Sequence, residues 1–262
     1  MFQFCSLYSG SSGNCSFVQS DTTKILIDAG ESAKKIGEAL ESIKVDPSSI
    51  NAILITHEHS DHIKGLGVFS KKFQIPVYAN LETWNAMPNQ KEKIDEKNIN
   101  IFNFDKFNIG DIEVKPFSIP HDAANPCGFN LYHKNKKMSI ATDIGHMNKD
   151  VINNLTNSSF ILLEANYEPE ILKCSSYPYL LKERIKGPNG HLSNSDAGKT
   201  ISYLMNYGLN NAMLGHLSKE NNFPELAYKT VVEELMEKQF SENSLHLSVA
   251  SRFEVSPIID VG

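Results

Sequence analysis

The chain has 262 residues, of which 40% are hydrophobic and 21% charged, an ordinary composition for a soluble globular protein. Its formal net charge of −6 excludes the strongly basic class of nucleic-acid-binding proteins, although it leaves room for local basic patches. The four cysteines have no C-x-x-C spacing, which favours free thiols in a reducing compartment over a disulfide framework. The N-terminus lacks a signal-peptide pattern, and no apolar run approaches the roughly 20 residues of a membrane span. We therefore expect a cytoplasmic protein.

Short apolar runs alternate with amphipathic stretches along the whole chain, and the two patterns are typical of strands and helices respectively. In chain order the sequence predicts strands at 2–8, 15–19 and 24–27, a helix at 32–44, a strand at 53–56, a helix at 61–73, a strand at 76–79, a helix at 81–87, strands between 99 and 119, strands at 128–133 and 137–141, a helix at 147–156, a strand at 160–164, a helix from 193 to 207, a strand at 212–216, a helix at 224–240, and strands at 245–249 and 253–255. The stretch 89–98 is expected to be exposed and 167–190 irregular. The alternation predicts an α/β domain in which helices cover the outer faces of two sheets.

The strongest functional signal is the sequence His57-Glu-His59-Ser-Asp61-His62 at the end of a buried strand. His57 and His59 are two positions apart, so they lie on the same side of an extended backbone. Asp61 and His62 follow where a helix begins. A lone histidine is usually a surface or satisfied core residue, but burying four such groups without partners would be costly unless they bind a metal. The cluster therefore predicts a site for one metal ion, or for two close together.

Polar side chains also follow one predicted strand after another. They are Asp28, His57, His121, Asp143, Glu164 and His216. Such residues at the ends of strands would form a site along one edge of the sheets. Asp28 is interpreted as a carboxylate that orients a metal-binding histidine. Asp143, which precedes Ile-Gly, is well placed to bridge two metal ions.

The turn 9–14, Ser-Gly-Ser-Ser-Gly-Asn, has two interpretations. In the first, Ser11, Asn14 and the backbone N–H groups form a nest beside the active site that binds an anion. In the second, the turn is an ordinary hairpin with glycine and asparagine where tight turns need them. The sequence favours neither.

Five motifs of the chain resemble the pattern of the metallo-β-lactamase fold. They are Asp28, the run Thr56-His57-x-His59-x-Asp61-His62, His121, Asp143 and His216. The resemblance implies an αββα sandwich of two mixed β-sheets flanked by helices, with a two-metal site at its edge. It also implies that His57, His59 and His121 hold one metal ion, that Asp61, His62 and His216 hold the second, and that Asp143 bridges them. Zinc suits such histidine-rich sites, and mixed carboxylate sites also accept manganese or iron.

A closer resemblance is to the YycJ/WalJ-type group of this superfamily. It rests on the turn 9–14, on Gly190-His191-Leu-Ser193-Asn194 and on the stretch 214–222. That group is described as degrading double-stranded DNA from the 5′ end and is linked to mismatch repair. Larger nucleic-acid-processing members insert an accessory domain between the bridging aspartate and the last histidine. Here only 73 positions (216 − 143) separate them, so we expect one domain over residues 1–262 without such an insertion.

The resemblance also implies roles in phosphodiester hydrolysis. Two divalent ions would clamp the attacking and leaving oxygens and lower the pKa of bound water toward about 7, and Asp61 would accept its proton. His191, oriented by Glu164, is expected to contact the scissile phosphate or protonate the leaving oxygen; packing beside a helix start is the alternative. From the residues alone, Ser193 or Asn194 is expected to cap that helix, and Asn221 and Asn222 to help shape the pocket.

Charge runs supply candidate contacts to a nucleic-acid substrate. They are Lys134, Lys136 and Lys137 in one hairpin turn, and Lys182, Arg184 and Lys186 before His191. Such runs are usually solvated surface, but places near strand ends or the His191 loop would suit phosphate binding. The predicted function is a metal-dependent phosphodiesterase, most closely a DNA exonuclease. The alternatives are a small-molecule hydrolase acting on a cyclic phosphodiester or thioester, and a regulatory protein whose site no longer turns over.

Overall fold

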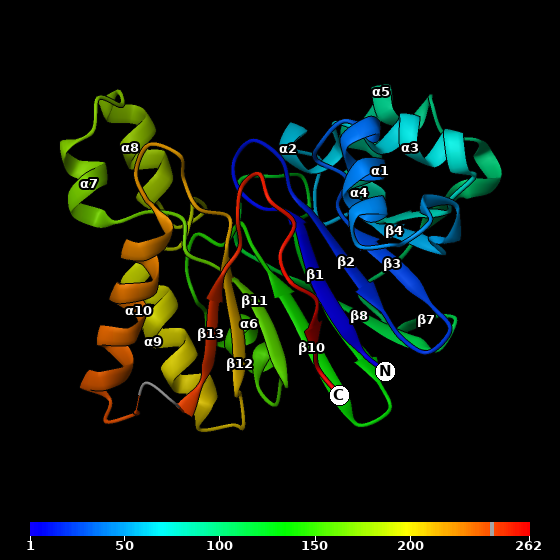
Figure 1. Ribbon diagram of the computed structural model, residues 1–262. Helices are drawn as coiled ribbons and strands as arrows, with labels where there is room; N and C mark the ends of the chain where they lie inside the picture. The colour runs from blue at the N-terminus through cyan, green and yellow to red at the C-terminus, as the bar shows by residue number, and fades with distance from the viewer. Residues whose placement is uncertain (242–243) are drawn as a thin grey trace.

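The protein is described by a computed structural model that covers residues 1–241 and 244–262. Two seven-stranded sheets pack face to face (Figure 1). The first has the order β14-β1-β2-β3-β4-β5-β6, with β1 (Gln3–Tyr8), β2 (Cys15–Gln19), β3 (Lys24–Ile27), β4 (Ala52–Leu54), β5 (Val77–Ala79), β6 (Ile99–Ile101) and β14 (Ile259–Asp260). The second has the order β13-β12-β11-β10-β9-β8-β7, with β7 (Phe107–Ile109), β8 (Ile112–Ser118), β9 (Cys127–His133), β10 (Lys136–Ala141), β11 (Phe160–Glu164), β12 (Asn211–Gly215) and β13 (His246–Val249). Each sheet is mixed, with antiparallel pairs on one side and parallel pairs on the other.

The described residues also form ten α-helices. They are α1 (Ala33–Ser42), α2 (Ser60–Ile63), α3 (Leu66–Phe73), α4 (Leu81–Ala86), α5 (Pro88–Lys91), α6 (Lys149–Leu155), α7 (Pro169–Cys174), α8 (Tyr179–Lys186), α9 (Asn194–Met205) and α10 (Pro224–Glu237), with short 3-10 turns at Pro47–Ser49 and Glu96–Asn98. α1, α3 and α4 pack on the first sheet, and α6, α9 and α10 on the second (Figure 1). This arrangement confirms the predicted αββα sandwich. None of the helices in the described residues is long and apolar enough to cross a membrane.

The apolar side chains of the central strands alternate between two cores. On β3, Leu26 joins the outer cluster under α1 and α3, whereas Ile25 and Ile27 lie in the cluster between the sheets. On β11, Leu162 lies between the sheets, and Leu163 packs outward with α9 and α10. Because successive strand side chains point to opposite faces, strands buried on both faces are apolar at nearly every position. Each fully buried Leu or Ile contributes about 1.5–3 kcal/mol.

Three predictions of local structure are wrong. The helix expected at 61–73 is two helices, because the Gly65 N–H donates to the Ala29 carbonyl at 2.9 Å instead of continuing the helical hydrogen bonds. The stretch 167–190, expected to be irregular, contains α7 and α8. The strand expected at 253–255 is absent from the described residues, and β14 pairs with β1 instead. Short helices and strands of this kind depend on tertiary contacts more than on local pattern.

The parallel strands direct their carboxyl ends to one edge of the sandwich. β10, β11 and β12 are parallel neighbours, so Asp143, Glu164 and His216 leave the second sheet at the same edge. β3 and β4 are parallel in the first sheet and lead to Asp28 and His57. The fold therefore brings residues from distant parts of the chain to one place.

Candidate metal centre

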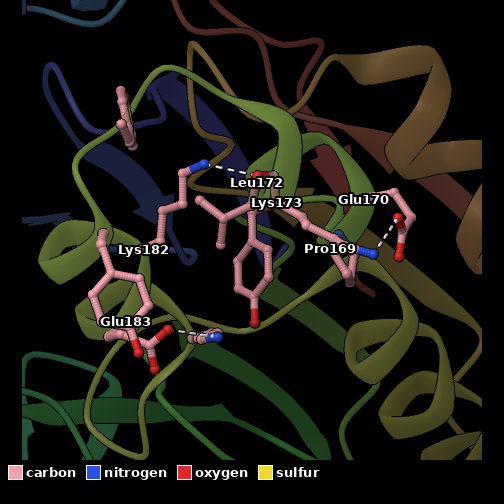
Figure 2. Close-up of a pocket in the computed structure, with 10 residues that line it drawn as sticks. Pro169, Glu170, Leu172, Lys173, Lys182 and Glu183 are labelled. Carbon is pink, nitrogen blue, oxygen red and sulfur yellow. Dashed lines mark hydrogen bonds and ion pairs between the residues drawn. The ribbon is translucent and has the colours of Figure 1, made fainter.

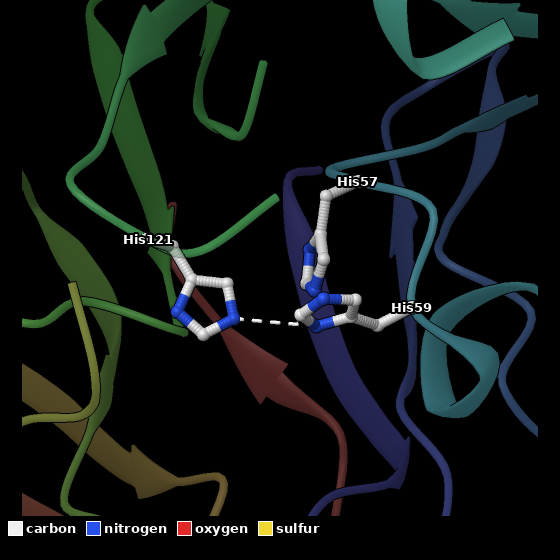
Figure 3. A group of neighbouring side chains, drawn as sticks. All are labelled: His57, His59 and His121. Atoms are coloured by element: carbon white, nitrogen blue, oxygen red, sulfur yellow. Dashed lines mark hydrogen bonds between the residues drawn. The ribbon is translucent and has the colours of Figure 1, made fainter. Parts of the chain in front are cut away.

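Histidine and aspartate side chains from both sheets gather at this edge. Their ligand atoms form groups of three, each within 4.8 Å of one another: His57, His59 and His121; Asp61, His62 and His216; and His57, His62 and Asp143. Figure 3 shows His121 facing His57 and His59 from the opposite side. Asp143 lies between the groups, because its two oxygens are 3.2 Å from His62 Nε2 and 3.7 Å from His121 Nε2. All seven candidate ligands are thus brought together.

The backbone at this edge adopts an unusual conformation at three strand exits. Asp28, Asp143 and His216 have φ values of +63°, +61° and +54°, in the left-handed region. Few non-glycine residues adopt this conformation, which costs about 1–3 kcal/mol each and concentrates at functional sites. The positive φ value at each of these residues sets the direction of its side chain relative to the preceding strand. No sequence pattern indicated this conformation.

Hydrogen bonds orient the histidines of the first sheet. Asp28 Oδ2 lies 2.8 Å from His62 Nδ1, and Thr56 donates its hydroxyl proton to Asp28 Oδ2 at 2.9 Å. Thr56 Oγ1 is also 3.0 Å from His57 Nδ1. With each Nδ1 engaged, Nε2 is the nitrogen that faces the cluster, which is the arrangement that fixes metal-binding histidines. Thr56 belongs to a sequence motif, but no pattern in the sequence indicated this role.

Glu164 orients two further histidines, His191 and His216, in the same way. Its Oε1 is 2.8 Å from His216 Nδ1 and 2.8 Å from His191 Nδ1. Its Oε2 accepts the backbone N–H groups of Ile144 at 2.8 Å and Leu192 at 3.0 Å. Burial would raise the pKa of Glu164, but the two histidines outweigh it and lower the pKa to about 2. The sequence analysis linked this carboxylate to His191 alone.

His191 stands beside the seven-residue cluster with one ring nitrogen free. Its Nδ1 is held by Glu164, and the side chain is 18% exposed. The ring centroid lies 5.2 Å from that of His121 and 5.3 Å from that of His216. Burial would lower the pKa of His191, yet the Glu164 and Asp143 carboxylates raise it. The ring is therefore placed to present an N–H to a group bound between the two sheets.

The donor set fits divalent cations. Within residues 1–241 and 244–262, His57 Nε2 and Asp143 Oδ2 are buried and have no hydrogen-bond partner, and such atoms cost about 1–3 kcal/mol each. Burial would lower the pKa of His216, but Asp143, Asp61 and Glu164 raise it to about 10, so the carboxylates attract positive charge. The pKa of His57 is instead lowered by burial and by the neighbouring histidines, which keeps its imidazole neutral. Nitrogen and carboxylate donors without thiolates are typical of catalytic rather than structural zinc sites.

Three backbone N–H groups of the turn 9–14 are not available for the anion-binding nest that is one of its two interpretations. The N–H groups of Gly10, Gly13 and Asn14 are already bonded to Asn14 Oδ1, the Gly10 carbonyl and the Asp61 carbonyl. Ser11 is exposed at the tip, and it is Ser9 that reaches the site, accepting the His216 N–H at 2.8 Å. Asn14 Nδ2 does lie near the cluster, 3.1 Å from His62 Nε2.

Two other predicted residues lie behind the site. Ser193 caps α9 by accepting the Asp196 N–H, as expected for a helix start. Asn222 donates to the carbonyls of Ala165 and Asn166 and exchanges hydrogen bonds with Asn194, so it braces the loop after β11. Asn166, which the sequence analysis missed, donates to the His216 carbonyl at 2.8 Å.

The basic residues of the hairpin turn lie at the wrong end of the sheet for phosphate binding. The turn precedes β10, whereas Asp143 follows it, and a six-residue strand separates them by about 20 Å. Lys134 pairs with Asp21 at 2.7 Å. Lys137 donates to the carbonyls of Asn154 and Thr156 and thereby caps the end of α6. The prediction that this turn lies near the site is wrong.

The second basic group is near the site but is internally paired. Arg184 forms a two-pronged pair with Asp122, the residue after His121. Lys186 pairs with Glu183 at 2.7 Å. Lys182 donates to two backbone carbonyls at 2.8 and 2.7 Å.

Comparisons with known proteins identify the family of the chain. A model of the metallo-beta-lactamase superfamily matches residues 8–184. Exodeoxyribonuclease WalJ of Streptococcus pneumoniae serotype 2 is 41% identical over 237 residues, which cover 89% of this chain and 88% of that protein. Exodeoxyribonuclease YycJ of Bacillus anthracis is 38% identical over 90% of both chains. The metallo-beta-lactamase fold protein YhfI from Bacillus subtilis shares the fold, with a TM-score of 0.73 at 14% identity over 98% of this chain and 99% of its own. The chain belongs to the metallo-beta-lactamase superfamily.

Proposed function

We propose that this protein is a metal-dependent exodeoxyribonuclease that degrades double-stranded DNA from the 5′ end and acts in mismatch repair. The observation that carries the proposal is the cluster of seven nitrogen and carboxylate ligands with the His191–Glu164 pair, 2.8 Å apart, beside it. The substrate class is supported by the two relatives named exodeoxyribonucleases. The 5′ polarity and the repair pathway are what the resemblance of the sequence motifs to the YycJ/WalJ-type group implies.

In this proposal the cluster holds two divalent ions, zinc by preference and manganese or iron as alternatives. His57, His59 and His121 hold one ion, and Asp61, His62 and His216 the other, with Asp143 between them. When bound, such a pair activates water and stabilises the charge that develops on phosphate oxygens. Asp28, Thr56 and Glu164 keep the histidines oriented, so their removal weakens the site without removing a ligand.

Two side chains of the proposed site move protons. Asp61 is 21% exposed and its Oδ2 is 3.4 Å from His216 Nε2, so it can accept a proton from attacking water while staying in the cluster. His191 presents its free Nε2 to the scissile phosphate and protonates the oxygen that leaves phosphorus. The carboxylate of Glu164 stabilises the protonated ring before transfer.

The cysteines support a reducing compartment and, with it, a cytoplasmic location. Cys5, Cys15 and Cys127 are buried free thiols, and Cys174 is an exposed one. Burial raises the pKa of the Cys15 and Cys127 thiols well above the usual range, so they stay protonated and unreactive. An exposed free thiol such as Cys174 persists best where disulfides are kept reduced.

A substrate panel tests the proposal. The protein is stripped with a chelator and assayed with zinc, manganese or iron on 5′-labelled duplex DNA, 3′-labelled duplex DNA, single-stranded DNA, RNA and bis(p-nitrophenyl) phosphate. We expect metal-dependent release of short 5′-labelled products from the duplex from the first time point. Hydrolysis of the small phosphodiester with no DNA degradation would favour the small-molecule alternative. Inactivity on every substrate with two bound metals would favour the regulatory alternative.

A further inference from the structure

The chain leaves the sandwich between Glu164 and His191 and forms a separate arm. This arm, residues 167–190, carries α7 and α8 and projects beyond the end of the sheets (Figure 1). It has an apolar cluster of its own, made of Tyr167, Leu172 and Ile185, which is distinct from the three clusters of the sandwich. The arm therefore begins three residues after one member of the His191–Glu164 pair and ends one residue before the other.

The arm contains a cavity of ≈ 560 Å³, within the usual range for sites that hold small molecules or single residues of a polymer. Tyr167, Tyr177 and Tyr179 contribute to its lining together with Pro169 and Leu172. Figure 2 shows the opening between the two helices, with α8 residues on one side and α7 residues on the other. Tyr179 is 71% exposed at the start of α8, so its ring is accessible to a ligand.

The charges around the cavity neutralise one another. Lys186 pairs with Glu183 at 2.7 Å, and Lys173 pairs with Glu170 at 3.5 Å. The Lys182 ammonium is engaged by backbone carbonyls. No side chain of this lining is left as a dedicated phosphate ligand. Aromatic walls with a balanced polar rim suit a flat heterocycle, and nucleobases bind proteins by stacking on such rings.

The cavity is directly coupled to the proposed active site. The His191 N–H donates to the Ile185 carbonyl of α8 at 2.8 Å. A Cβ at Gly190 would lie 2.2 Å from the carbonyl oxygens of Arg184 and Ile185, so only glycine allows α8 to sit this close to His191. A nucleotide whose phosphate contacts His191 would have its neighbours within reach of the arm.

We propose that the cavity of the arm is a nucleobase-binding subsite that holds one base of the DNA strand next to the scissile phosphate by stacking on Tyr179. This inference rests on the proposed nuclease function. A base that enters the cavity must leave the duplex stack, and a terminal base does so at the lowest cost. The arm would thus hold the strand end open while His191 acts on the backbone.

A double-mutant cycle between protein and DNA tests the inference. One partner is Tyr179→Ala, and the other is a duplex series that carries one abasic nucleotide at each of the first four positions from the end that the wild type degrades. Tyr179→Ala, and base removal at the one position that occupies the cavity, are each expected to raise KM at least about fivefold, equivalent to ~1 kcal/mol of lost stacking, with kcat within about twofold. At one abasic position, Tyr179→Ala and the missing base together should raise KM no more than either change does alone.

Two further variants separate stacking from other effects. Tyr179→Phe keeps the ring and should retain the wild-type KM, whereas loss of affinity in this variant would assign the effect to the hydroxyl and overturn the stacking proposal. Tyr207→Ala removes an exposed tyrosine ring beyond the far end of α9, about 18 Å from Ser193, and should change nothing. Because Tyr179 is exposed, its replacement should leave the melting temperature unchanged.

The outcomes distinguish this inference from the function on which it rests. Suppose the wild type degrades DNA, but the fold-changes in KM from Tyr179→Ala and from base removal multiply at all four positions. The base-binding subsite is then refuted, and the proposed nuclease function is unaffected. Wild-type KM for Tyr179→Ala on intact duplex would refute it equally. If the metal-loaded wild type degrades no DNA, both proposals fall.

Discussion

Glu164 stabilises the fold through bonds to backbone N–H groups and orients two histidines of the proposed site. The substitution Glu164→Gln tests both roles. The carboxylate accepts four hydrogen bonds, two from histidine Nδ1 atoms and two from backbone N–H groups. A glutamine has one oxygen and one NH2 group. In either orientation, the NH2 group therefore faces two donors and two hydrogen bonds are lost.

The magnitude follows from those two bonds. Hydrogen bonds to a charged group contribute about 1.5–3 kcal/mol each, so the variant should lose about 3–6 kcal/mol in free energy of unfolding. If the NH2 group faces the histidines, His191 and His216 can recover these two bonds only by adopting the opposite tautomer, which opposes metal binding. Nε2 of His216 then carries a proton, and metal affinity should fall about 10–100-fold.

The assay combines urea unfolding of the metal-free protein with metal content and turnover on duplex DNA. The matched control is Glu31→Gln, a buried glutamate whose partners are Lys35 and Lys64 rather than histidines. The control should lose less than about 1 kcal/mol, as expected for pairs with solvated lysines. A Glu164→Gln variant that loses no more than this control, with wild-type metal content and turnover, would refute the reasoning.

Three further predictions concern stability and binding. Burial lowers the pKa of Lys137 to about 8, so between pH 8 and about 10.5 the folded state binds fewer protons than the unfolded state. In urea unfolding, the stability of the wild type relative to Lys137→Met should therefore rise over this pH window, by about 1–3 kcal/mol after discounting for solvent contact. A stability difference that does not change with pH would contradict this prediction. Chelation should lower the melting temperature, and metal at about 1,000 times its Kd should restore ~4 kcal/mol; an unchanged melting curve would argue against a metal site. Because the basic groups are internally paired, the slope of log K for DNA against log salt should be about −2 to −3, and a slope steeper than about −5 would show phosphate contacts that this account lacks.

Much of the fold was predictable because its strands are buried on both faces and its helices are amphipathic. The grouping of Asp28, His57, Asp143 and His216 was predictable for a related reason, since each follows an apolar run and parallel strands end at one edge. Neither inference needed knowledge of side-chain contacts.

What the sequence did not indicate depends on contacts between distant segments. The bonds from Glu164 to two histidines and from Asn166 to the His216 carbonyl join different strands. The lysine hairpin was misplaced although chain order alone puts the turn before the strand 137–141 and Asp143 after it. α7 and α8 were missed because they are short and held by their own small core around Leu172.

The proposed nuclease site at this edge of the sandwich holds two metal ions, and His191 acts there on phosphate. Both features are tested most directly by measuring bound metal and 5′-labelled duplex degradation together for the wild type and His191→Ala. We predict two ions per chain in both proteins, with turnover reduced about 100-fold or more in the variant. A wild type that degrades DNA without metal, or a His191→Ala variant with two ions and wild-type turnover, would contradict the account.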